Sequence, residues 1–367
     1  MSESMKESLK AVENAAILIP SLEPDERLPA YIRKLSENGF GQIIVVDDGS
    51  SEAYQPIFRE VESIDRAVVL HHGVNRGKGV ALKTGYQYIL DNLPGTEGII
   101  TADADGQHTV PDCIHLAEEL QKGRKALYLG SRDFTLPNIP PKSRSGNRIT
   151  SVVFKVLYGQ YLPDTQTGLR AFRREELPFM ISVDGERFEY EMKVLIACTR
   201  AGIPIIPITI ETIYENENEG THFHPIKDSF RIYKVILGSF LRFMASSLCC
   251  VVLDQGLFNL LNLAVFANGD KKNASVILLC TVIARVVSAT VNFLLNRNVV
   301  FGSKGKAGRA FVRYVILAVI IMLLSAGGTW LLGLTGMSST IAKLIVDTLL
   351  YFVSYRVQQQ WVFKEEA

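Results

Sequence analysis

The C-terminal third of the chain contains four long apolar stretches, and these constrain the fold more than any other feature. Each is close to the roughly 20 residues that a helix needs to cross a bilayer. They lie at about residues 239–266, 275–295, 312–334 and 339–355. Only 17 of the 132 residues in 236–367 are charged, and 12 of these are basic. The pattern predicts an all-α domain of four transmembrane helices over residues 236–367.

The loop between the second and third stretches predicts the orientation of these helices. It has no acidic residue, and its basic residues are Arg297, Lys304, Lys306, Arg309 and Arg313. Basic loops stay in the cytoplasm, so both termini and the preceding domain are expected on the cytoplasmic side of the cell membrane. The sequence leaves open whether the chain forms a homo-oligomer.

Ionisable residues interrupt the apolar stretches, where isolated charges are costly. They are Asp254, Arg285, Lys343 and Asp347. Two interpretations stay open: these residues line a route for a sugar headgroup through the bilayer, or they clamp the helices together. No internal repeat is evident from the sequence.

Residues 1–235 have the composition of a soluble domain, with 27 basic and 33 acidic residues. The whole chain is 47% hydrophobic and 21% charged, a composition that excludes disorder and nucleic-acid-binding tails. Buried strands are predicted at 15–20, 42–46, 67–70, 98–101 and 126–129, with helices at 28–38, 80–92 and 111–122. This alternation predicts an α/β, Rossmann-like domain with a mostly parallel sheet, whose ligands bind at the carboxyl ends of the strands.

The strongest motif, TADADGQH, directly follows the strand predicted at 98–101. The carboxylates of Asp103 and Asp105 and the amide of Gln107 form an oxygen-rich set suited to Mg²⁺ or Mn²⁺. A polar turn that ends the strand is the alternative interpretation.

Three other strand ends carry polar groups that complement such a site. Asp48 follows one strand and suits a nucleobase or ribose. Lys78 lies in the glycine-rich segment NRGKG at the start of a helix, an arrangement that suits phosphate. Arg132 follows another strand and adds a fork-shaped cation. Together these groups predict base, phosphate and metal sites along one sheet edge.

Six motifs, IPSLEPDE, VVDDGS, NRGKG, DADGQH, GSR and DTQTGLRAF, occur in this order. With them, residues 13–235 resemble family 2 glycosyltransferases of the polyprenyl-phosphate sugar synthase type, the dolichyl-phosphate mannose synthase-like enzymes. The segments LCCVVLDQGLFNLL, ARVVSATVNFLLNRNVVF and KLIVDTLLYFVSYRVQQQWVF resemble a GtrA-like membrane domain. The resemblance implies a GT-A fold over residues 1–235 and a metal-dependent, inverting hexosyltransferase. It would move a hexose from a UDP-glucose or GDP-mannose type of nucleotide sugar to polyprenyl (undecaprenyl) phosphate at the cytoplasmic face.

The resemblance also implies roles for individual residues. Asp103, Asp105 and Arg132 would be catalytic, and Asp103, Asp105 and Gln107 would hold the metal. The nucleotide sugar would be bound by Pro20, Leu22, Glu23, Val46, Asp48, Lys78, Ala104, Asp105, Arg132 and His222. The chain departs from the family at Glu23-Pro24, where Asn-Glu is usual, and at Gly220-Thr221-His222, where His222 would need a proton to replace a lysine.

The acceptor side is predicted from a basic and apolar segment. Arg144 and Arg148 precede an apolar run, so the segment 144–158 is expected to be an interfacial helix that grips the acceptor phosphate at headgroup depth. A second interfacial helix is expected near 226–238. Further residues expected at the acceptor phosphate or the sugar are Asp164, Gln166, Arg170 and Glu189. Glu189 and Glu191 are two residues apart, so at most one is expected to face the sugar.

Two alternatives to this function remain at the level of sequence. The chain could be a translocator of lipid-linked sugars with a regulatory nucleotide-binding domain. It could also transfer sugar to a hydroxyl acceptor, with Glu189 or Asp164 as the base. For the enzyme itself, the membrane domain could be an anchor only or could also flip the product.

Overall fold

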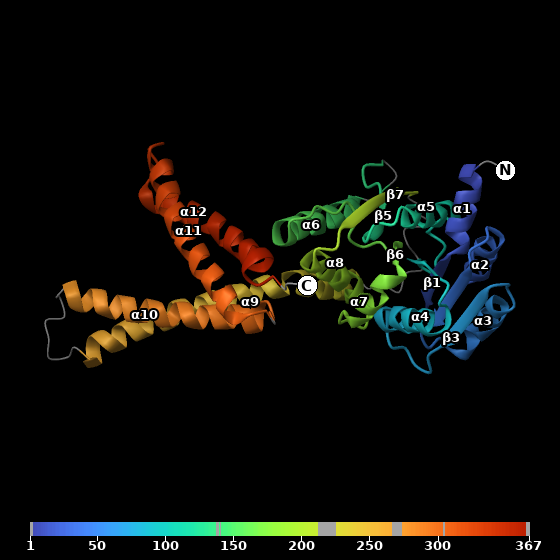
Figure 1. Ribbon diagram of the computed structural model, residues 1–367, viewed down its shortest axis with the longest axis horizontal. Coiled ribbons are helices and arrows are strands. Elements are labelled where there is room, and N and C mark those ends of the chain that lie inside the picture. The colour runs from blue at the N-terminus through green and yellow to red at the C-terminus, as the bar shows by residue number, and fades with distance from the viewer. Residues whose placement is uncertain are drawn as a thin grey trace. The chain divides into compact units, whose positions relative to one another are not determined.

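The computed structural model describes residues 3–136, 139, 141–211, 225–265, 274–303 and 305–364 (Figure 1). The chain divides into two compact units, Met1–Ile236 and Leu237–Ala367. Each unit is considered by itself below.

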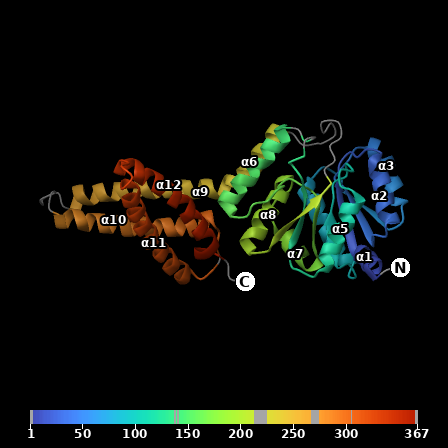
Figure 2. The ribbon, with the colours of Figure 1, turned by 90° about the horizontal axis from the view of Figure 1, so that it is seen from above.

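A seven-stranded sheet forms the centre of the first unit (Figure 2). Its strands are β1 (Ala15–Ser21), β2 (Gln42–Asp47), β3 (Ala67–His71), β4 (Gly98–Thr101), β5 (Leu127–Arg132), β6 (Arg170–Arg173) and β7 (Ile205–Ile210). The order across the sheet is β3-β2-β1-β4-β6-β5-β7. All neighbours are parallel except β6, which runs antiparallel to both β4 and β5. The expected mostly parallel sheet and its first five strands are therefore confirmed.

Helices cover both faces of this sheet because successive strand residues point to opposite sides. They are α1 (Glu3–Glu13), α2 (Arg27–Glu37), α3 (Gln55–Glu62), α4 (Lys78–Asn92), α5 (Val110–Gln121), α6 (Pro141–Tyr158), α7 (Leu177–Ser182) and α8 (Glu189–Ala201). Ile17 and Ile43 belong to a buried cluster with apolar residues of α1, α2, α3 and α5. Leu18 lies on the opposite face, where its side chain occupies the space that a side chain at Gly85 of α4 would fill.

Helix α6 and the beginning of α9 (Pro225–Leu260) are joined within the first unit. Thr150 and Tyr233 share a hydrogen bond of 3.2 Å between their hydroxyls, and the Tyr158 hydroxyl donates to the Ile236 carbonyl at 2.8 Å. Both segments expected to be interfacial are therefore helical in the structure.

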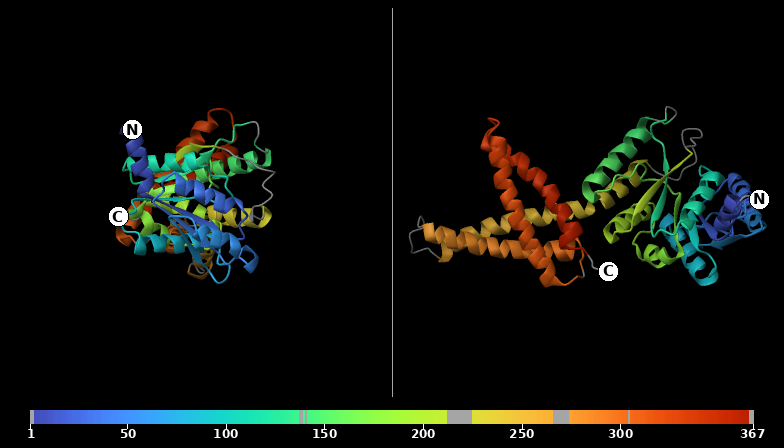
Figure 3. Two further views of the ribbon diagram at one scale, coloured as in Figure 1. Left: turned by 90° about the vertical axis from the view of Figure 1, so that its right-hand side faces the viewer. Right: turned by 45° about the horizontal axis from the view of Figure 1, so that its top comes forward.

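The second unit is helical and consists of two helix pairs (Figure 3). After α9 come α10 (Ala274–Leu295), α11 (Ala307–Gly333) and α12 (Ser339–Val357), and π turns follow α10 at Asn296–Val300 and α12 at Gln358–Val362. Among the described residues, three helices are long and apolar enough to cross a membrane: Phe230–Leu263, Ser275–Val300 and Ala307–Gly333. The fourth predicted stretch is the 19-residue α12, so a fourth span stays a prediction.

Candidate functional site

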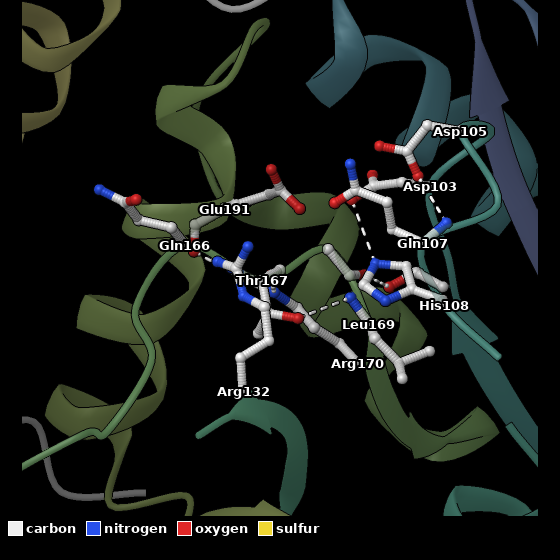
Figure 4. Close-up of polar contacts among 12 residues, drawn as sticks. Asp103, Asp105, Gln107, His108, Arg132, Gln166, Thr167, Leu169, Arg170 and Glu191 are labelled. Carbon is white, nitrogen blue, oxygen red and sulfur yellow. Dashed lines mark hydrogen bonds and ion pairs between the residues drawn. The ribbon is translucent and has the colours of Figure 1, made fainter. Parts of the chain in front are cut away.

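Four of the polar residues singled out above follow the carboxyl ends of β4 and β5: Asp103, Asp105, Gln107 and Arg132 (Figure 4). One cleft at this edge is lined by Asp103, Gln107, His108, Arg132, Gln166, Thr167, Gly168, Ile210 and Glu211. Two separate elements of the sequence therefore meet there: the DADGQH motif after β4 and the segment 164–168 before β6.

Asp103 is half-buried and lies at the centre of a cluster of charged side chains. Its Oδ1 accepts from Lys78 Nζ at 2.7 Å, and its Oδ2 lies 3.2 Å from His108 Nε2. Lys78 Nζ also lies 3.0 Å from Glu191 Oε2. Burial acts to raise the pKa of Asp103, but Lys78 and His108 outweigh it and hold that pKa well below its usual value. Asp103 is therefore ionised at neutral pH.

Lys78, which was predicted to bind phosphate, pairs with two carboxylates in the structure. Burial acts to lower its pKa, but the charges of Asp103 and Glu191 raise that pKa above the usual lysine value. The ammonium group bridges two carboxylates and its side chain is 16% exposed, so its charge is largely committed within the protein. It acts on the site through Asp103.

Gly168 is required for Asp103 to occupy its position. A Cβ at Gly168 would lie 2.4 Å from Asp103 Oδ2 and 2.5 Å from Oδ1, far inside contact distance. The Gly168 carbonyl accepts from the Thr101 hydroxyl at 2.7 Å, which fixes the loop to β4. The carboxylate therefore rests directly on the backbone of the DTQTGLRAF motif.

Asp105 adds a second carboxylate next to Asp103. Burial and the Asp103 charge both raise the pKa of Asp105, and its Oδ1 accepts from the Gln107 backbone N–H at 3.0 Å. Two neighbouring carboxylates that repel each other are stabilised by a cation between them. The described residues contain no cluster of three or more His, Cys, Asp or Glu suited to a metal, so a cation here would depend on two carboxylates and the Gln107 amide.

Arg132 is held in place by a buried carboxylate. Its Nε donates to Asp164 Oδ2 at 2.7 Å and its Nη2 to Oδ1 at 3.3 Å, and Asp164 is fully buried. Asp164 also accepts from the Gln166 backbone N–H at 2.9 Å. Asp164 therefore orients Arg132 and its own loop, whereas Arg132, Gln166 and Thr167 line the cleft.

Arg170 and Glu189 do not line this cleft. Arg170 is buried, and it donates to the carbonyls of Thr167 and Glu191 at 3.1 and 2.7 Å. Glu189 accepts from the backbone N–H groups of Glu186 and Arg187 at the start of α8. Glu191 takes the place beside Lys78 that sequence reasoning did not assign. Its spacing from Glu189 indicated that only one of the two would face the site, without deciding which.

Asp48 organises the glycine-rich loop. Its carboxylate accepts from the backbone N–H groups of Arg76 at 3.0 Å and Gly77 at 2.7 Å, and it lies 2.8 Å from His72 Nδ1. Gly77 has a φ of +101°, and a Cβ there would lie 2.4 Å from the Glu186 carbonyl oxygen. Only glycine fits this position without strain.

The remaining residues expected at the nucleotide differ in their exposure. Pro20 and Val46 are buried in β1 and β2, while Leu22 and Ala104 are partly exposed. Glu23 is exposed with a φ of +49°, and its backbone N–H donates to the Ser50 hydroxyl at 2.8 Å. His222 lies outside the described residues.

Helix α6 presents basic and apolar residues on one exposed face. Arg144, Arg148 and Lys155 lie along one side of it, beside Ile149, Val152 and Val156. The apolar run of this segment was expected to lie on a membrane surface, but two of its residues, Phe154 and Leu157, are buried. A helix that packs on a domain can present only one face, and these two side chains point to the other one.

The comparisons with known proteins agree with this architecture. Residues 17–178 match the family "Glycosyl transferase family 2", and residues 242–363 match "GtrA/DPMS, transmembrane domain". The chain is 27% identical to the UDP-N-acetylglucosamine–dolichyl-phosphate N-acetylglucosaminyltransferase of Methanococcus voltae, over 54% of this chain and 85% of the relative. It is 27% identical to the glycosyltransferase AglJ of Haloferax volcanii, over 59% and 69%.

A comparison with solved structures also gives a match. It is glucosyl-3-phosphoglycerate synthase from Mycobacterium tuberculosis in complex with Mn²⁺, UDP and glucosyl-3-phosphoglycerate, with a TM-score of 0.48 and 16% identity over 65% of this chain and 84% of that one. The mostly parallel, Rossmann-like sheet with one antiparallel strand is the GT-A-like fold expected from the sequence. The chain therefore joins a family 2 glycosyltransferase domain to a GtrA/DPMS-type transmembrane domain.

Proposed function

We propose that the chain is a membrane-bound, inverting glycosyltransferase that moves a hexose from a nucleotide sugar to a polyprenyl phosphate. Residues 1–235 would form the catalytic domain and residues 236–367 a membrane domain of four spans. The dolichyl-phosphate transferase among the relatives supports a lipid phosphate as the acceptor.

One observation carries the proposal: α6 links an exposed basic and apolar face to the cleft. Its buried Asn147 donates to the Pro163 carbonyl and accepts from the Thr165 backbone N–H at 3.3 Å, on both sides of Asp164. Asp164 in turn holds Arg132 in the cleft. A lipid phosphate bound along α6 would therefore lie next to the group that orients the cleft arginine.

The chemistry of this acceptor suits the residues present. A phosphate monoester is already anionic near neutral pH, since its second pKa is about 6. Its oxygen can attack the anomeric carbon without a strong general base, and a single in-line displacement inverts that carbon. The protein must then stabilise the leaving diphosphate and hold two anions together. Arg132 in the cleft and Arg144 and Arg148 on α6 supply positive charge for these tasks.

Asp103, Asp105 and Gln107 fit a divalent cation, because two adjacent carboxylates and an amide supply oxygen ligands and leave room for phosphate oxygens. Mg²⁺ or Mn²⁺ bound there would neutralise charge on the leaving diphosphate. Lys78 and His108 would keep Asp103 ionised for this role.

A direct assay tests the proposed function. Purified full-length protein in nanodiscs would be incubated with undecaprenyl phosphate and with radiolabelled UDP-glucose, UDP-N-acetylglucosamine or GDP-mannose. Transfer of label to the lipid phase, dependent on a divalent cation, is the expected result. Nucleotide binding without transfer to any lipid phosphate would contradict the enzyme and favour a translocator with a regulatory domain.

Arg148→Ala should raise the KM for the lipid phosphate about tenfold and leave the KM for the nucleotide sugar nearly unchanged. A tenfold change corresponds to about 1.4 kcal/mol, near the lower limit for one charge-assisted hydrogen bond. Arg148 is exposed and no described residue pairs with it, so its removal should not disturb the fold. Arg59→Ala, on the exposed surface of α3, is the control. Equal changes in both KM values would mean that Arg148 only anchors the domain to the membrane.

The proposed topology predicts that the loop between α10 and α11 faces the cytoplasm. Ser303 is buried, so the exposed Lys306 is the better site for a reporter cysteine. In a variant without the native cysteines, Lys306→Cys should react with an impermeant maleimide only after cell lysis. Labelling in intact cells would reject both the four-span model and the cytoplasmic catalytic domain.

A further inference from the structure

The two helix pairs of the membrane unit carry matching residues at matching places. The sequence FLRF at 240–243 of α9 corresponds to FVRY at 311–314 of α11, an offset of 71 residues. The π turn 296–300 and the following Phe301 correspond to the π turn 358–362 and Phe363, an offset of 62. Both turns close with the same backbone hydrogen bond of 2.9 Å, from Phe301 to Asn296 and from Phe363 to Gln358. These correspondences point to a repeat that is not evident from the sequence alone.

Aromatic contacts between the two pairs are reciprocal. The rings of Phe240 and Tyr355 lie 5.3 Å apart at 86°, and the corresponding rings of Phe311 and Phe293 lie 5.2 Å apart at 83°. The same correspondence between the two helix pairs relates two further pairs of ring contacts. Phe243–Tyr355 at 58° matches Tyr314–Phe293 at 60°, and Phe301–Tyr355 at 35° matches Phe363–Phe293 at 33°. Reciprocity of this kind is the property of a two-fold, isologous interface.

Residues on a two-fold axis contact their own equivalents, and two such contacts are present. Asn296 Nδ2 donates to Gln358 Oε1 at 3.0 Å, and the rings of Phe301 and Phe363 stack at 5.2 Å. Asn296 and Gln358 are both buried, and each also donates to the residue four positions earlier in its own helix: Asn292 at 2.8 Å and Ser354 at 3.1 Å. These contacts define a pseudo-two-fold axis through the Asn296–Gln358 pair.

The ionisable residues within the helices obey the same correspondence. Asp254 of α9 pairs with Arg285 of α10 at 3.2 Å. The offsets of 71 and 62 place Ser325 and Asp347 at the equivalent positions, and the Ser325 hydroxyl donates to the Asp347 carboxylate. Lys343, equivalent to Thr281, completes the second cluster at 3.0 Å from Asp347. Each helix pair thus has a polar contact between its own two helices at the same level.

We propose that the membrane unit is a duplicated helical hairpin: α9–α10 and α11–α12 are equivalent, Asn296 and Gln358 join them on the pseudo-two-fold axis, and Asp254–Arg285 and Ser325–Asp347 are equivalent clasps. The ring contacts between the hairpins lie within residues 240–243, 293–301, 311–314 and 351–363, whereas both clasps lie within a hairpin. The four ionisable residues therefore join the two helices within each hairpin and do not form one continuous polar route.

Exchange of one clasp for the other tests the equivalence. The triple variant Asp254→Ser, Arg285→Asp and Thr281→Lys gives the first hairpin the clasp of the second. Both tryptophans of the chain, Trp330 and Trp361, lie in the membrane unit, so tryptophan fluorescence follows its unfolding selectively. We expect the triple variant to unfold within about 3 °C of the wild type, and Arg285→Asp alone, which leaves two facing acids, at least about 5 °C lower. A triple variant as unstable as Arg285→Asp would overturn the equivalence.

The axis pair is tested by a reciprocal exchange that keeps one amide on each side. Asn296→Gln combined with Gln358→Asn should stay close to the wild-type unfolding midpoint. Asn296→Leu should lower it by about 5 °C or more, because Gln358 and Ser246 would lose a buried partner. Gln360→Leu is the matched control, because Gln360 is exposed and lies two residues after Gln358. An exchange variant as unstable as Asn296→Leu, or an Asn296→Leu variant as stable as the control, would reject the axis.

Discussion

Asp105→Asn is expected to lower the rate of sugar transfer by about 100-fold or more while leaving the protein folded. The substitution keeps the size of the side chain and removes one of two charged groups that would hold the divalent cation. Because burial and the Asp103 charge disfavour the ionised form of Asp105, loss of its charge relieves repulsion in the folded state. The thermal midpoint should therefore be unchanged or slightly higher, which a thermal unfolding curve measures. A radiolabel transfer assay with a Mn²⁺ titration measures the rate of transfer and its dependence on the cation.

Asp133→Asn is the matched control for this experiment. Asp133 follows β5 at the same end of the sheet, but its carboxylate accepts from Thr135 and does not line the cleft. The control should retain near-normal transfer and the wild-type dependence on Mn²⁺. Near-normal turnover of Asp105→Asn would remove Asp105 from the metal site.

Gly168→Ala should produce a loss of similar size by steric means alone. The added methyl group would lie 2.4 Å from Asp103 Oδ2, so the carboxylate must rotate away from Lys78 and His108. The loop cannot easily yield, because the Thr101 hydroxyl holds the Gly168 carbonyl at 2.7 Å. We expect transfer to fall about 100-fold, since a carboxylate displaced by about 1 Å loses the alignment on which catalysis depends.

Two further variants make this prediction decisive. Gly146→Ala introduces the same methyl group on α6, where nothing lies within 4 Å, and should leave activity unchanged. Asp103→Ala removes the atoms that the new methyl group would meet, so Gly168→Ala added to Asp103→Ala should lower the thermal midpoint no further than Asp103→Ala does alone, and neither variant should be active. Wild-type transfer by Gly168→Ala would show that the position of the Asp103 carboxylate is not critical.

The fold was largely predictable from local patterns, with two instructive exceptions. The first five strands are apolar runs, and burial of such runs in a parallel sheet favours strands whatever the rest of the chain does. β6 has only four residues, begins and ends with arginine, and exists because β4 and β5 pair with it on both sides. β7 contains Pro207, which is tolerated because β5 is the one described strand that pairs with β7, so β7 lies at the edge of the described sheet.

The partners within the site were decided by the tertiary structure. The sequence by itself determined that Asp103, Asp105, Gln107 and Arg132 follow strands that end at one sheet edge. It did not determine that Asp164, 32 residues from Arg132, would orient that arginine, or that Glu191 and not Glu189 would join Lys78. Such pairings depend on where distant loops meet, and the energy of a charge depends on the groups that surround it after folding.

The equivalence that we propose for the two hairpins of the membrane unit also depends on contacts between residues that are distant in the sequence. The sequence determined the apolar stretches and their internal charges, because the bilayer imposes length and polarity on each segment separately. Equivalent residues are 71 positions apart in α9 and α11 but 62 positions apart in α10 and α12, so no single offset aligns the two hairpins. Their clasps also use different residues, Asp254–Arg285 and Ser325–Asp347. Equivalence became visible only through reciprocal contacts, since packing conserves the place of an interaction and not the identity of the residues that make it.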